Sequence, residues 1–583
     1  MRLRKRALVV IAAIGLIAAA CGDDDGAETN TSTTVAGGTA ATSPPTTKTP
    51  VSGGTLTFGS YSKVQGLDPI VGLGQGTSGG IPMNAVYDTL TRWNPDTKQY
   101  VMRTAESVTA NADSTEWTVK LKPGIKFSDG SDYNAEAVQF GINRHRIRVG
   151  IPLTDCAKWW ACTGSAVSSG AYAALIKDVV VVDNLTLRFP LNEPYTAFPF
   201  IISAEAGMIP SMTAIKKACP DPTKAPNACE FNLKPVGAGA FMVDSYKPDD
   251  VISMVRNPTH YGGAAYLDGI KFLDLGDTGG LGTYEKLKTN TVQAAFLRDP
   301  QAVAQAKADK FAGFSTVNQN GAIVLLNMGV NATCAGGQPA PLCTGKPDGP
   351  TPTNPGTKEL KVRQAIAAAL DPKVINERGY GGKALAGSSL FQSSFPWDPK
   401  VPGAVYNPDN AKKLVQEAKA AGWSGNLSLL YVNTQLGRDV GQAVLTMVQT
   451  VGINATLETP ESTVQQQRVT STKDFEAATW GMALSGDDGA VFALAQNLRS
   501  DSPTNRIGFK SPIVDQALKD IRTAKNDAEK TAAFKKISEE VNLQVPFVTL
   551  GATEEYNVYS PKLQGAVGGG RSYVFFDKAW FEK

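Results

Sequence analysis

The residues best suited to nucleophilic chemistry lie in a glycine-rich stretch, where residues 76–80 (GTSGG) match the G-x-S-x-G pattern of a serine nucleophile. Such a serine needs a strand before it, a helix after it and a histidine that removes its proton. The preceding Gly-Leu-Gly-Gln does not predict a strand, and the chain has only two histidines, His145 and His260. The pattern therefore favours a loop that lines a cleft, with a hydrolase as the alternative from the enzyme class.

Metal chemistry has equally little support, and we predict no metal site and no cofactor. Six of the seven cysteines form three close pairs in the sequence, and none has the C-x₂-C spacing or a neighbouring histidine typical of zinc sites. An even number of cysteines in an exported chain favours disulfides, although six cysteines allow about 15 pairings. Pairing within each close pair is the simplest scheme: Cys156 with Cys162, Cys219 with Cys229, and Cys334 with Cys343.

The N-terminus has the form of an export signal. Residues 2–6 are rich in Arg and Lys, and Ala7–Ala20 is an apolar run too short to span a bilayer comfortably. Three alanines precede Cys21, which resembles a bacterial lipobox, although Ala18 stands where leucine is usual. We therefore expect residues 1–21 to be a lipoprotein signal peptide that leaves Cys21 acylated. An ordinary secretory signal with an incidental cysteine is the alternative.

Composition separates a tether from a globular body. Residues 22–52 are rich in Asp, Thr, Ser, Gly and Pro, so we expect a disordered tether with an end-to-end distance of roughly 30 Å. The whole chain of 583 residues, with 42% hydrophobic and 19% charged residues, is long enough for two or three domains. A formal charge of +3 provides no basic field, so nucleic acid is not an expected partner.

A hairpin is the element around which the remaining ones are arranged. Residues 240–243 and 251–255 are short apolar runs separated by the turn cluster 247–250. Gly237 and Gly239 before the first run predict a backbone that lies close to another segment. By themselves these residues predict a hairpin and nothing more specific.

The other elements alternate between strands and helices. Residues 84–93 predict a helix with one apolar face, and residues 116–121 alternate as a strand. Residues 358–370 predict a further helix, after which Asp371 should cap the next one with Pro372 at its first position. Similar alternation from residue 410 to 457 is typical of an α/β domain.

Several of these segments resemble the family 5 extracellular solute-binding proteins, the peptide- and nickel-type receptors of ABC importers. The matching segments are WTVKLKPGIKFSDG (117–130), PVGAGAF (235–241), RNPTHYGG (256–263) and VRQAIAAALD (362–371), in collinear order. The resemblance implies an α/β, two-lobed fold of the periplasmic-binding-protein type II, with a subdomain inserted in the first lobe. It implies lobe I at 53–84, 230–325 and 545–583, the inserted subdomain at 85–229, and lobe II at 326–544.

The same resemblance points to a ligand cleft between the lobes. In the peptide-binding members, an aspartate three residues after a tryptophan pairs with the ligand's ammonium group. Trp480 is the matching tryptophan here, but Ala483 stands where the aspartate would be. Asp487 or Asp488 could take that role, and a solvated turn is the alternative for both. The remaining candidate ligand residues are Gln75, Thr77, Phe296, Arg298, Trp397, Asn433 and Arg468.

The resemblance implies a receptor that is not an enzyme, acting as a monomer on the outer face of the cytoplasmic membrane, where a lipid on Cys21 anchors it. It would capture a small molecule or peptide by closing its lobes and deliver that solute to an ABC permease. A solute-sensing receptor without transport is the alternative within binding proteins, and an exported hydrolase is the alternative outside them.

Overall fold

The computed structural model describes residues 49–583, except residues 73, 149–155, 163–170, 277–278, 335–341, 344 and 483. The export signal, Cys21 and nearly all of the expected tether lie outside the described residues. No helix among the described residues is long and apolar enough to cross a membrane.

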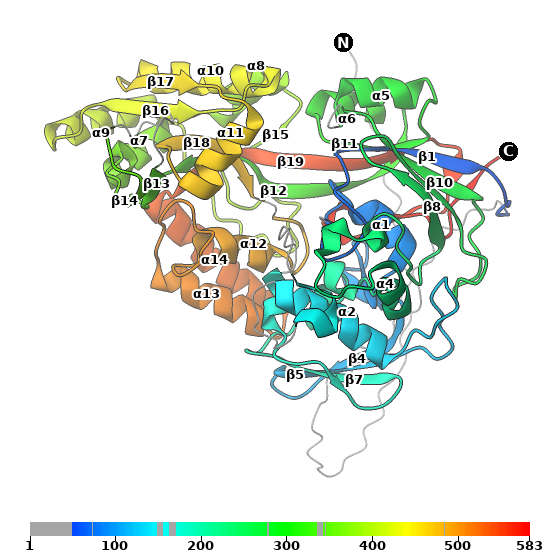
Figure 1. Ribbon diagram of the computed structural model, residues 1–583. Helices are drawn as coiled ribbons and strands as arrows, with labels where there is room; N and C mark the ends of the chain where they lie inside the picture. Colours follow the sequence, from blue (N-terminus) through cyan, green and yellow to red (C-terminus); the bar gives the residue numbers. More distant parts are fainter. Residues whose placement is uncertain are drawn as a thin grey trace, which may run out of the picture.

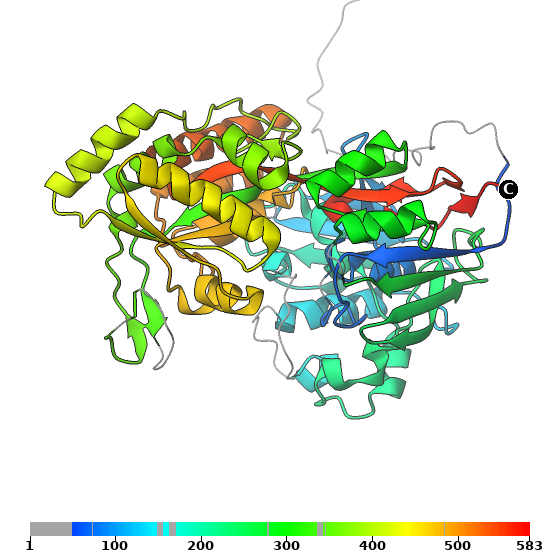
Figure 2. The same ribbon diagram turned by 90° about the horizontal axis from the view of Figure 1, so that it is seen from above.

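Two lobes lie side by side and share one large mixed sheet (Figures 1 and 2). Its central strands are β12 (Ala312–Leu326) and β19 (Phe547–Tyr559), a long antiparallel pair that runs from one lobe into the other. Successive hydrogen-bonded strands on either side of this pair build the two lobes. The two-lobed α/β architecture expected from the sequence is therefore confirmed.

Lobe I continues the sheet from β19. Its strands follow in the order β11 (Ala294–Leu297), β1 (Thr55–Ser60), β10 (Gly269–Asp274), β9 (Val251–Arg256) and β8 (Phe241–Lys247). Its helices are α1 (Gly80–Tyr87), α5 (Leu281–Lys288) and α6 (Pro300–Ala308). Four short strands near the C-terminus complete this lobe: β20 (Leu563–Gln564), β21 (Val567–Gly568), β22 (Val574–Phe575) and β23 (Trp580–Phe581).

The predicted hairpin is confirmed as the antiparallel pair β8 and β9. The two glycines before it lie against the chain near the end of α1. A side chain on Gly237 would stand 2.3 Å from the carbonyl oxygen of Val86, and one on Gly239 would stand 2.4 Å from that of Ala85. The prediction of close backbone approach is correct at both positions, because no other residue would fit between hairpin and helix.

The inserted subdomain is a small sheet covered by helices. Its sheet has the order β4 (Ala105–Ala110), β5 (Glu116–Leu121), β7 (Thr186–Pro190) and β6 (Val180–Val181). The helices are α2 (Ala135–Arg148), α3 (Phe198–Ile201) and α4 (Met212–Ala218), and β2 (Thr91–Asn94) pairs with β3 (Gln99–Met102).

The helix predicted over residues 84–93 is wrong in its second half. Helix α1 ends at Tyr87, and Asp88 adopts a left-handed φ of 56° before the chain continues as β2. The Asp88 carboxylate accepts two hydrogen bonds from Arg103 Nε and one from Arg103 Nη2 at 2.8 Å. These long-range contacts hold Asp88 in a conformation that stops the helix, and helical periodicity could not reveal them.

Lobe II continues the sheet from β12 through β18 (Ala477–Met482), β16 (Asn426–Leu430) and β17 (Asn454–Glu458). The helices α7 (Leu360–Ala369), α8 (Pro372–Tyr380), α9 (Pro408–Ala420), α10 (Gln435–Thr450) and α11 (Ser462–Gln467) follow in chain order. Three more form a separate group in Figure 1, α12 (Ala490–Leu498), α13 (Pro512–Thr523) and α14 (Asp527–Gln544). The short strands are β13 (Ala332–Cys334), β14 (Gly349–Thr351) and β15 (Leu385–Ala386). Asp371 caps α8 with Pro372 at its first position, as predicted.

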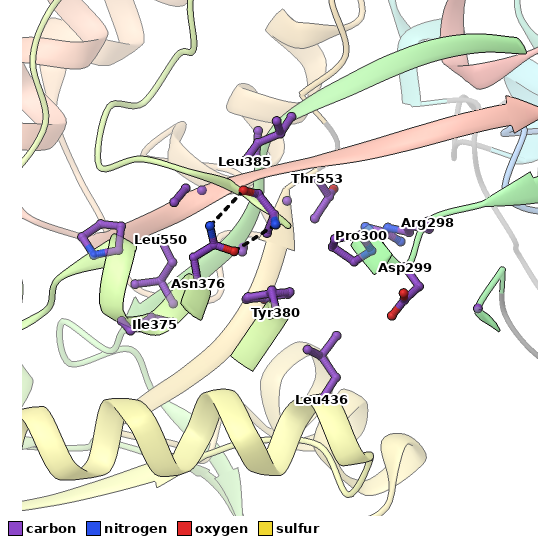
Figure 3. A pocket seen from close by; sticks show the side chains of 18 of the residues that line it. Arg298, Asp299, Pro300, Ile375, Asn376, Tyr380, Leu385, Leu436, Leu550 and Thr553 are labelled. Atoms are coloured by element: carbon purple, nitrogen blue, oxygen red, sulfur yellow. Dashed lines mark hydrogen bonds between the residues drawn. The ribbon is translucent and has the colours of Figure 1, made fainter. Parts of the chain in front are cut away.

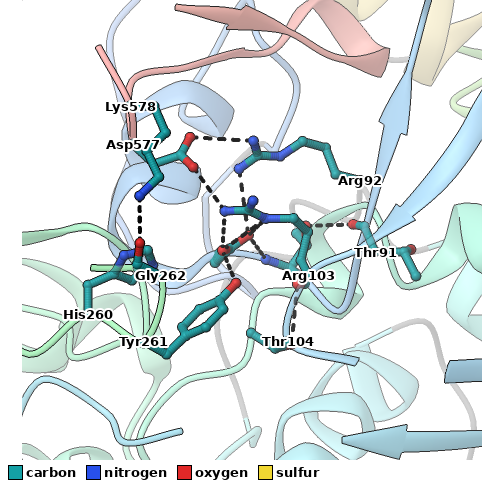
Figure 4. A network of polar contacts seen from close by, with 12 residues as sticks. Thr91, Arg92, Arg103, Thr104, His260, Tyr261, Gly262, Asp577 and Lys578 are labelled. Carbon is teal, nitrogen blue, oxygen red and sulfur yellow. Dashed lines mark hydrogen bonds and ion pairs between the residues drawn. The ribbon is translucent and has the colours of Figure 1, made fainter. Parts of the chain in front are cut away.

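A partly buried network of charges ties the inserted subdomain to the C-terminal tail (Figure 4). Asp577 accepts from Arg103 at 3.1 Å and from Arg92 at 3.4 Å, while Asp88 accepts from Arg103 and from the Tyr261 hydroxyl at 2.7 Å. Two arginines and two aspartates thus compensate one another within a partly buried site. We call these four side chains the Asp–Arg cluster.

The six cysteines of the globular body lie in the three close pairs that the sequence suggests. The Cα atoms are 4.9 Å apart for Cys156 and Cys162, 5.7 Å apart for Cys219 and Cys229, and 5.4 Å apart for Cys334 and Cys343. All three distances lie within the range that a disulfide bridges without backbone movement.

Candidate ligand-binding cleft

Two of the cavities that lie where lobe I and lobe II meet contain residues singled out in the sequence. The first cavity has a volume of about 400 Å³ and takes its walls from both lobes (Figure 3). Tyr61, Arg298 and Asp299 come from lobe I, while Tyr380 and Leu436 come from lobe II. Leu550 to Thr553 of β19 also line it, so the strands that join the lobes form part of its wall.

The second cavity, of about 200 Å³, is lined by all three parts of the fold. Gln75 and Thr77 come from the glycine-rich loop before α1. Tyr172 and Phe200 come from the inserted subdomain. Lobe II contributes Ser485, Gly489, Phe492, Ala493 and Gln496, the crossing strands contribute Asn318 and Glu555, and the C-terminal tail contributes Arg571 and Ser572.

The glycine-rich loop is fixed by the C-terminal tail. Gly76 N–H donates to the Arg571 carbonyl oxygen at 3.0 Å, and a side chain on Gly76 would stand 2.1 Å from the Ser572 carbonyl oxygen. Arg571 and Ser572 both adopt a left-handed φ, of 58° and 59°. Two consecutive non-glycine residues in this conformation store backbone strain, which is typical of ligand-contacting segments.

Arg298 and Glu555 connect the two cavities. Arg298 lines the first cavity, Glu555 lines the second, and Arg298 Nε lies 3.8 Å from Glu555 Oε1. At this distance the two side chains form an ion pair but no hydrogen bond. The Arg298 guanidinium also donates to the Tyr61 hydroxyl at a long 3.4 Å. Burial alone would lower the pKa of Arg298, but the nearby Tyr61 and Glu555 raise it, so this side chain stays charged.

Glu555 is a buried carboxylate with neutral hydrogen-bond donors. Its side chain is 7% exposed. Asn318 Nδ2 donates to Oε1 at 2.9 Å, and the Ser572 hydroxyl donates to Oε2. Each donor comes from a different segment of the cleft wall, so the position of Glu555 is well defined.

Arg571 is, in contrast, held by a short ion pair. Its guanidinium donates to Glu205 Oε1 at 2.8 Å and to the Tyr172 hydroxyl at 2.6 Å. Burial alone would lower the pKa of Arg571, and the Glu205 carboxylate overrides this effect and raises it. Arg571 therefore fixes the wall of the second cavity.

Aromatic rings join the inserted subdomain to lobe II beside the second cavity. The ring of Phe492 on α12 stacks on Phe200 with centroids 5.7 Å apart, and it meets Tyr172 and Tyr195 edge-on at 5.6 Å each. Buried residues of both parts accordingly belong to one continuous hydrophobic core. The lobes are thus in contact across the cleft.

The two aspartates proposed for an ammonium group have other partners. Asp487 is 2% exposed, and its Oδ1 accepts from the Ser485 hydroxyl at 2.7 Å and from the Gly489 N–H at 2.9 Å. Burial raises the pKa of Asp487. Asp488 accepts from Lys530 Nζ at 2.6 Å and from the Tyr100 hydroxyl at 3.0 Å. Neither aspartate lines either of the two cavities.

The structure does not bring the other candidates into these cavities. Phe296 is a fully buried residue of β11. The Trp397 indole N–H donates to Asp527 Oδ1 at 2.8 Å, and its ring stacks on Phe534. Asn433 is an exposed residue whose side chain donates to Glu461, although the adjacent Thr434 lines the first cavity.

Arg468 and Trp480 also lie outside the two cavities. Arg468 is buried within lobe II, where Nη1 donates to Glu458 Oε2 at 2.6 Å and Nε donates to the Asp474 carbonyl oxygen. The guanidinium of Arg506 stacks over the ring of Trp480 at 5.1 Å. Arg468 and Asp487 therefore do not face one cleft in this structure.

Nothing in the described geometry activates Ser78. His145 is buried in α2, and burial lowers its pKa to about 4. The ring of His260 contacts the Gly263 carbonyl oxygen at 3.0 Å. Neither histidine is hydrogen-bonded to Ser78, and among the described residues no group of three His, Cys, Asp or Glu could hold a metal ion.

Glu555, Arg571 and the aromatic wall of the second cavity were not predicted from the sequence. Glu555 gives no usable signal there, because it follows another glutamate, Glu554, and is flanked by the polar residues Thr553 and Asn557. Arg571 follows a run of three glycines, which reads as a loop and gives no indication of its partners.

The chain belongs to the bacterial extracellular solute-binding proteins of family 5, whose middle region it matches over residues 99–503. The resemblance inferred from the sequence motifs is therefore confirmed. The protein is an extracytoplasmic solute-binding protein, and its two-lobed architecture with a cleft between the lobes is that of the family.

Individual relatives cover most of the chain at low identity. The dipeptide-binding protein of Escherichia coli is 24% identical over 464 residues, which is 76% of this chain and 78% of that protein. Heme-binding protein A of Haemophilus influenzae is 22% identical over 520 residues, or 86% and 88% of the two chains. The oligopeptide-binding protein AppA of Bacillus subtilis, solved with a nonapeptide, has a TM-score of 0.70 at 19% identity and covers 92% of this chain and 100% of its own.

Proposed function

We propose that the protein captures a short peptide or a similar small solute between its lobes and delivers it to an ABC importer. One observation carries the proposal: the second cavity is lined at once by lobe I, the inserted subdomain and lobe II. A ligand in such a cavity contacts both lobes only when they are closed, so binding stabilises the closed state. Peptide-binding relatives with the same fold support this assignment.

Gln75 and Thr77 are the candidates from the sequence that fit this role best, together with Arg298 at the first cavity. The two cavities are small, which suits a compact ligand better than a long peptide. In this proposal the protein is a binding protein and not an enzyme, which its membership of the family supports.

Anchoring by a lipid on Cys21 and action as a monomer belong to the same proposal. The small residues before Cys21 and the tether composition after it support the anchor. A tether of roughly 30 Å would let the two lobes approach a permease in the same membrane.

The test has two parts. Protein purified from its native membrane should release a small solute that mass spectrometry identifies, and adding that solute should shrink the radius of gyration in solution scattering. A strain without the gene should take up the labelled solute more slowly. Normal uptake combined with tight binding would instead support a solute-sensing receptor, and turnover of the solute would support a hydrolase.

A further inference from the structure

We propose that Glu555 is the carboxylate that binds a protonated amino group of the solute, and that Arg298 binds an anionic group of the same solute. This inference rests on the proposed function and specifies its ligand as a short zwitterion, such as an amino acid or a dipeptide. It assigns recognition of the amino group to β19, a strand that joins the lobes, and recognition of the anionic group to the residue that follows β11 of lobe I.

Other carboxylates near the cleft already have partners. Asp299, which lines the first cavity, caps α6 by accepting from the Gln301 and Ala302 N–H groups at 2.9 Å each. The aspartate that follows the matching tryptophan in peptide-binding members is replaced by Ala483 in the sequence. Asp487 is held by Ser485 and Gly489 within its own loop, and Asp488 forms a 2.6 Å ion pair with Lys530. Glu205 similarly pairs with Arg571 at 2.8 Å.

Glu555 differs from the last three of these carboxylates because it lines one of the two cavities. Its two hydrogen-bond donors, Asn318 and Ser572, are neutral, and its cationic neighbour Arg298 stays 3.8 Å away. A carboxylate accepts about four hydrogen bonds, so lone pairs remain for an ammonium group. Because Glu555 lines the second cavity, a ligand there can reach it without displacing the protein's own short ion pairs.

Arg298 completes the match on the other side. Its side chain is 31% exposed, faces the first cavity, and has only the long contacts to Tyr61 and Glu555 among the hydrogen bonds and ion pairs of the described residues. A guanidinium offers a fork of donors that suits a carboxylate. The first cavity is otherwise largely apolar, with Tyr380, Leu436 and Leu550 in its wall, so it can receive an apolar side chain of the ligand.

A matched set of probes tests the assignment by calorimetric titration of the full-length protein freed of solute. The probes are L-leucine and L-leucyl-L-leucine, each also as its N-acetyl and its C-terminal amide derivative. Wild-type protein should bind at least one free probe, and N-acetylation or amidation should weaken binding by about 30-fold, because each removes one charge-assisted contact. Comparing the affinities for the amino acid and the dipeptide shows which of these two classes of zwitterion the protein binds more tightly.

The variants assign each charge to its residue. In Glu555→Gln the penalty for N-acetylation should vanish while that for amidation remains, and Arg298→Gln should show the reverse pattern. Glu554→Gln is the matched control, because the neighbouring glutamate pairs with Lys307 at 2.5 Å and lies outside both cavities. Each penalty is the ratio of the affinities of the free probe and its derivative, both measured on the same variant. A modest loss of stability in that variant therefore does not obscure the penalty.

Two results would overturn the inference. One is an N-acetylation penalty that persists in Glu555→Gln, and the other is a wild-type protein that binds none of the free probes. The proposed function fails separately, if no solute co-purifies and no probe or solute closes the lobes. A co-purified solute without an amino group would refute the role of Glu555 and leave solute capture intact.

Discussion

The Tyr100 hydroxyl of the inserted subdomain donates to Asp488 Oδ2 of lobe II at 3.0 Å. The same carboxylate accepts a hydrogen bond at 2.6 Å from Nζ of Lys530, a residue of α14 in lobe II. A second polar contact crosses nearby, where Arg522 Nη1 donates to Glu193 Oε1 at 2.5 Å. These contacts form only when the lobes meet, so they hold the closed arrangement in addition to any ligand.

Removing the Tyr100 hydroxyl should therefore weaken closure. We expect Tyr100→Phe to lower solute affinity by about 5-fold, the effect of one hydrogen bond to a charged group that is partly replaced by water. Titration calorimetry and solution scattering with the co-purified solute measure the two effects. Tyr284→Phe is the control, because its hydroxyl bonds Asp309 within lobe I. Equal affinities for wild type and Tyr100→Phe would show that this contact does not contribute to closure.

The aromatic contact should make a larger contribution to the closed state than this hydrogen bond. Phe492→Ala removes ring contacts to Phe200, Tyr172 and Tyr195, all of which belong to the inserted subdomain. We expect the unliganded protein to become more open in solution scattering and the solute affinity to fall by about tenfold, since aromatic pairs contribute about 0.5–1.5 kcal/mol each beyond burial. An unchanged radius of gyration would count against this role.

The elements that could be predicted from the sequence are those set by local pattern. The β8–β9 hairpin follows from two short apolar runs and a turn cluster, and the cap of α8 follows from Asp371 and Pro372. The end of α1 could not be predicted, because Asp88 is held by Arg103, which lies 15 residues further along the chain, between β3 and β4. Glu555 and Arg571 likewise acquire their roles from partners that are remote in the sequence.

Acid should destabilise the protein through the Asp–Arg cluster. Burial alone would raise the pKa of Asp88, but Arg103 and Arg92 override it and lower the pKa to about 2, and the pKa of Asp577 is lowered further by the same arginines. A carboxyl group whose pKa is lower in the folded than in the unfolded state stabilises the fold at pH values above its unfolded-state pKa. This contribution is lost as the pH falls from about 4 toward 2. We expect Asp88 to contribute about 2 kcal/mol in this way.

Urea unfolding at a series of pH values checks this prediction. The free energy of unfolding should fall steeply below pH 4 in the wild type and less steeply in Asp88→Asn, which has no carboxylate to protonate. Asp409→Asn, an exposed carboxylate in α9, should follow the wild type. Parallel curves for wild type and Asp88→Asn would refute the contribution of Asp88.

The three local disulfides remain a prediction that peptide mapping under non-reducing conditions can check. We expect disulfide-linked peptides that join Cys156 to Cys162, Cys219 to Cys229 and Cys334 to Cys343. The reason is that the Cα atoms of the pairs are only 4.9, 5.7 and 5.4 Å apart. Replacing both cysteines of one pair by alanine should lower the free energy of unfolding by about 2–3 kcal/mol. Free thiols, or bridges between different pairs, would contradict the scheme.

Arg468 provides the sharpest contrast between sequence pattern and structure. The family resemblance makes it a candidate ligand residue, whereas the structure buries it against Glu458 and the Asp474 carbonyl oxygen within lobe II. Removing its charge should therefore affect stability and leave ligand recognition unchanged. We expect Arg468→Gln to lower the free energy of unfolding by about 1–3 kcal/mol, since Glu458 loses its partner. The affinity of Arg468→Gln for the co-purified solute should stay within about twofold of wild type. In contrast, Arg298→Gln should lose much of its affinity for the solute and keep a free energy of unfolding close to that of wild type. Urea unfolding and titration calorimetry on both variants make the comparison, and a large loss of affinity in Arg468→Gln would place the ligand in lobe II and not at the two cavities.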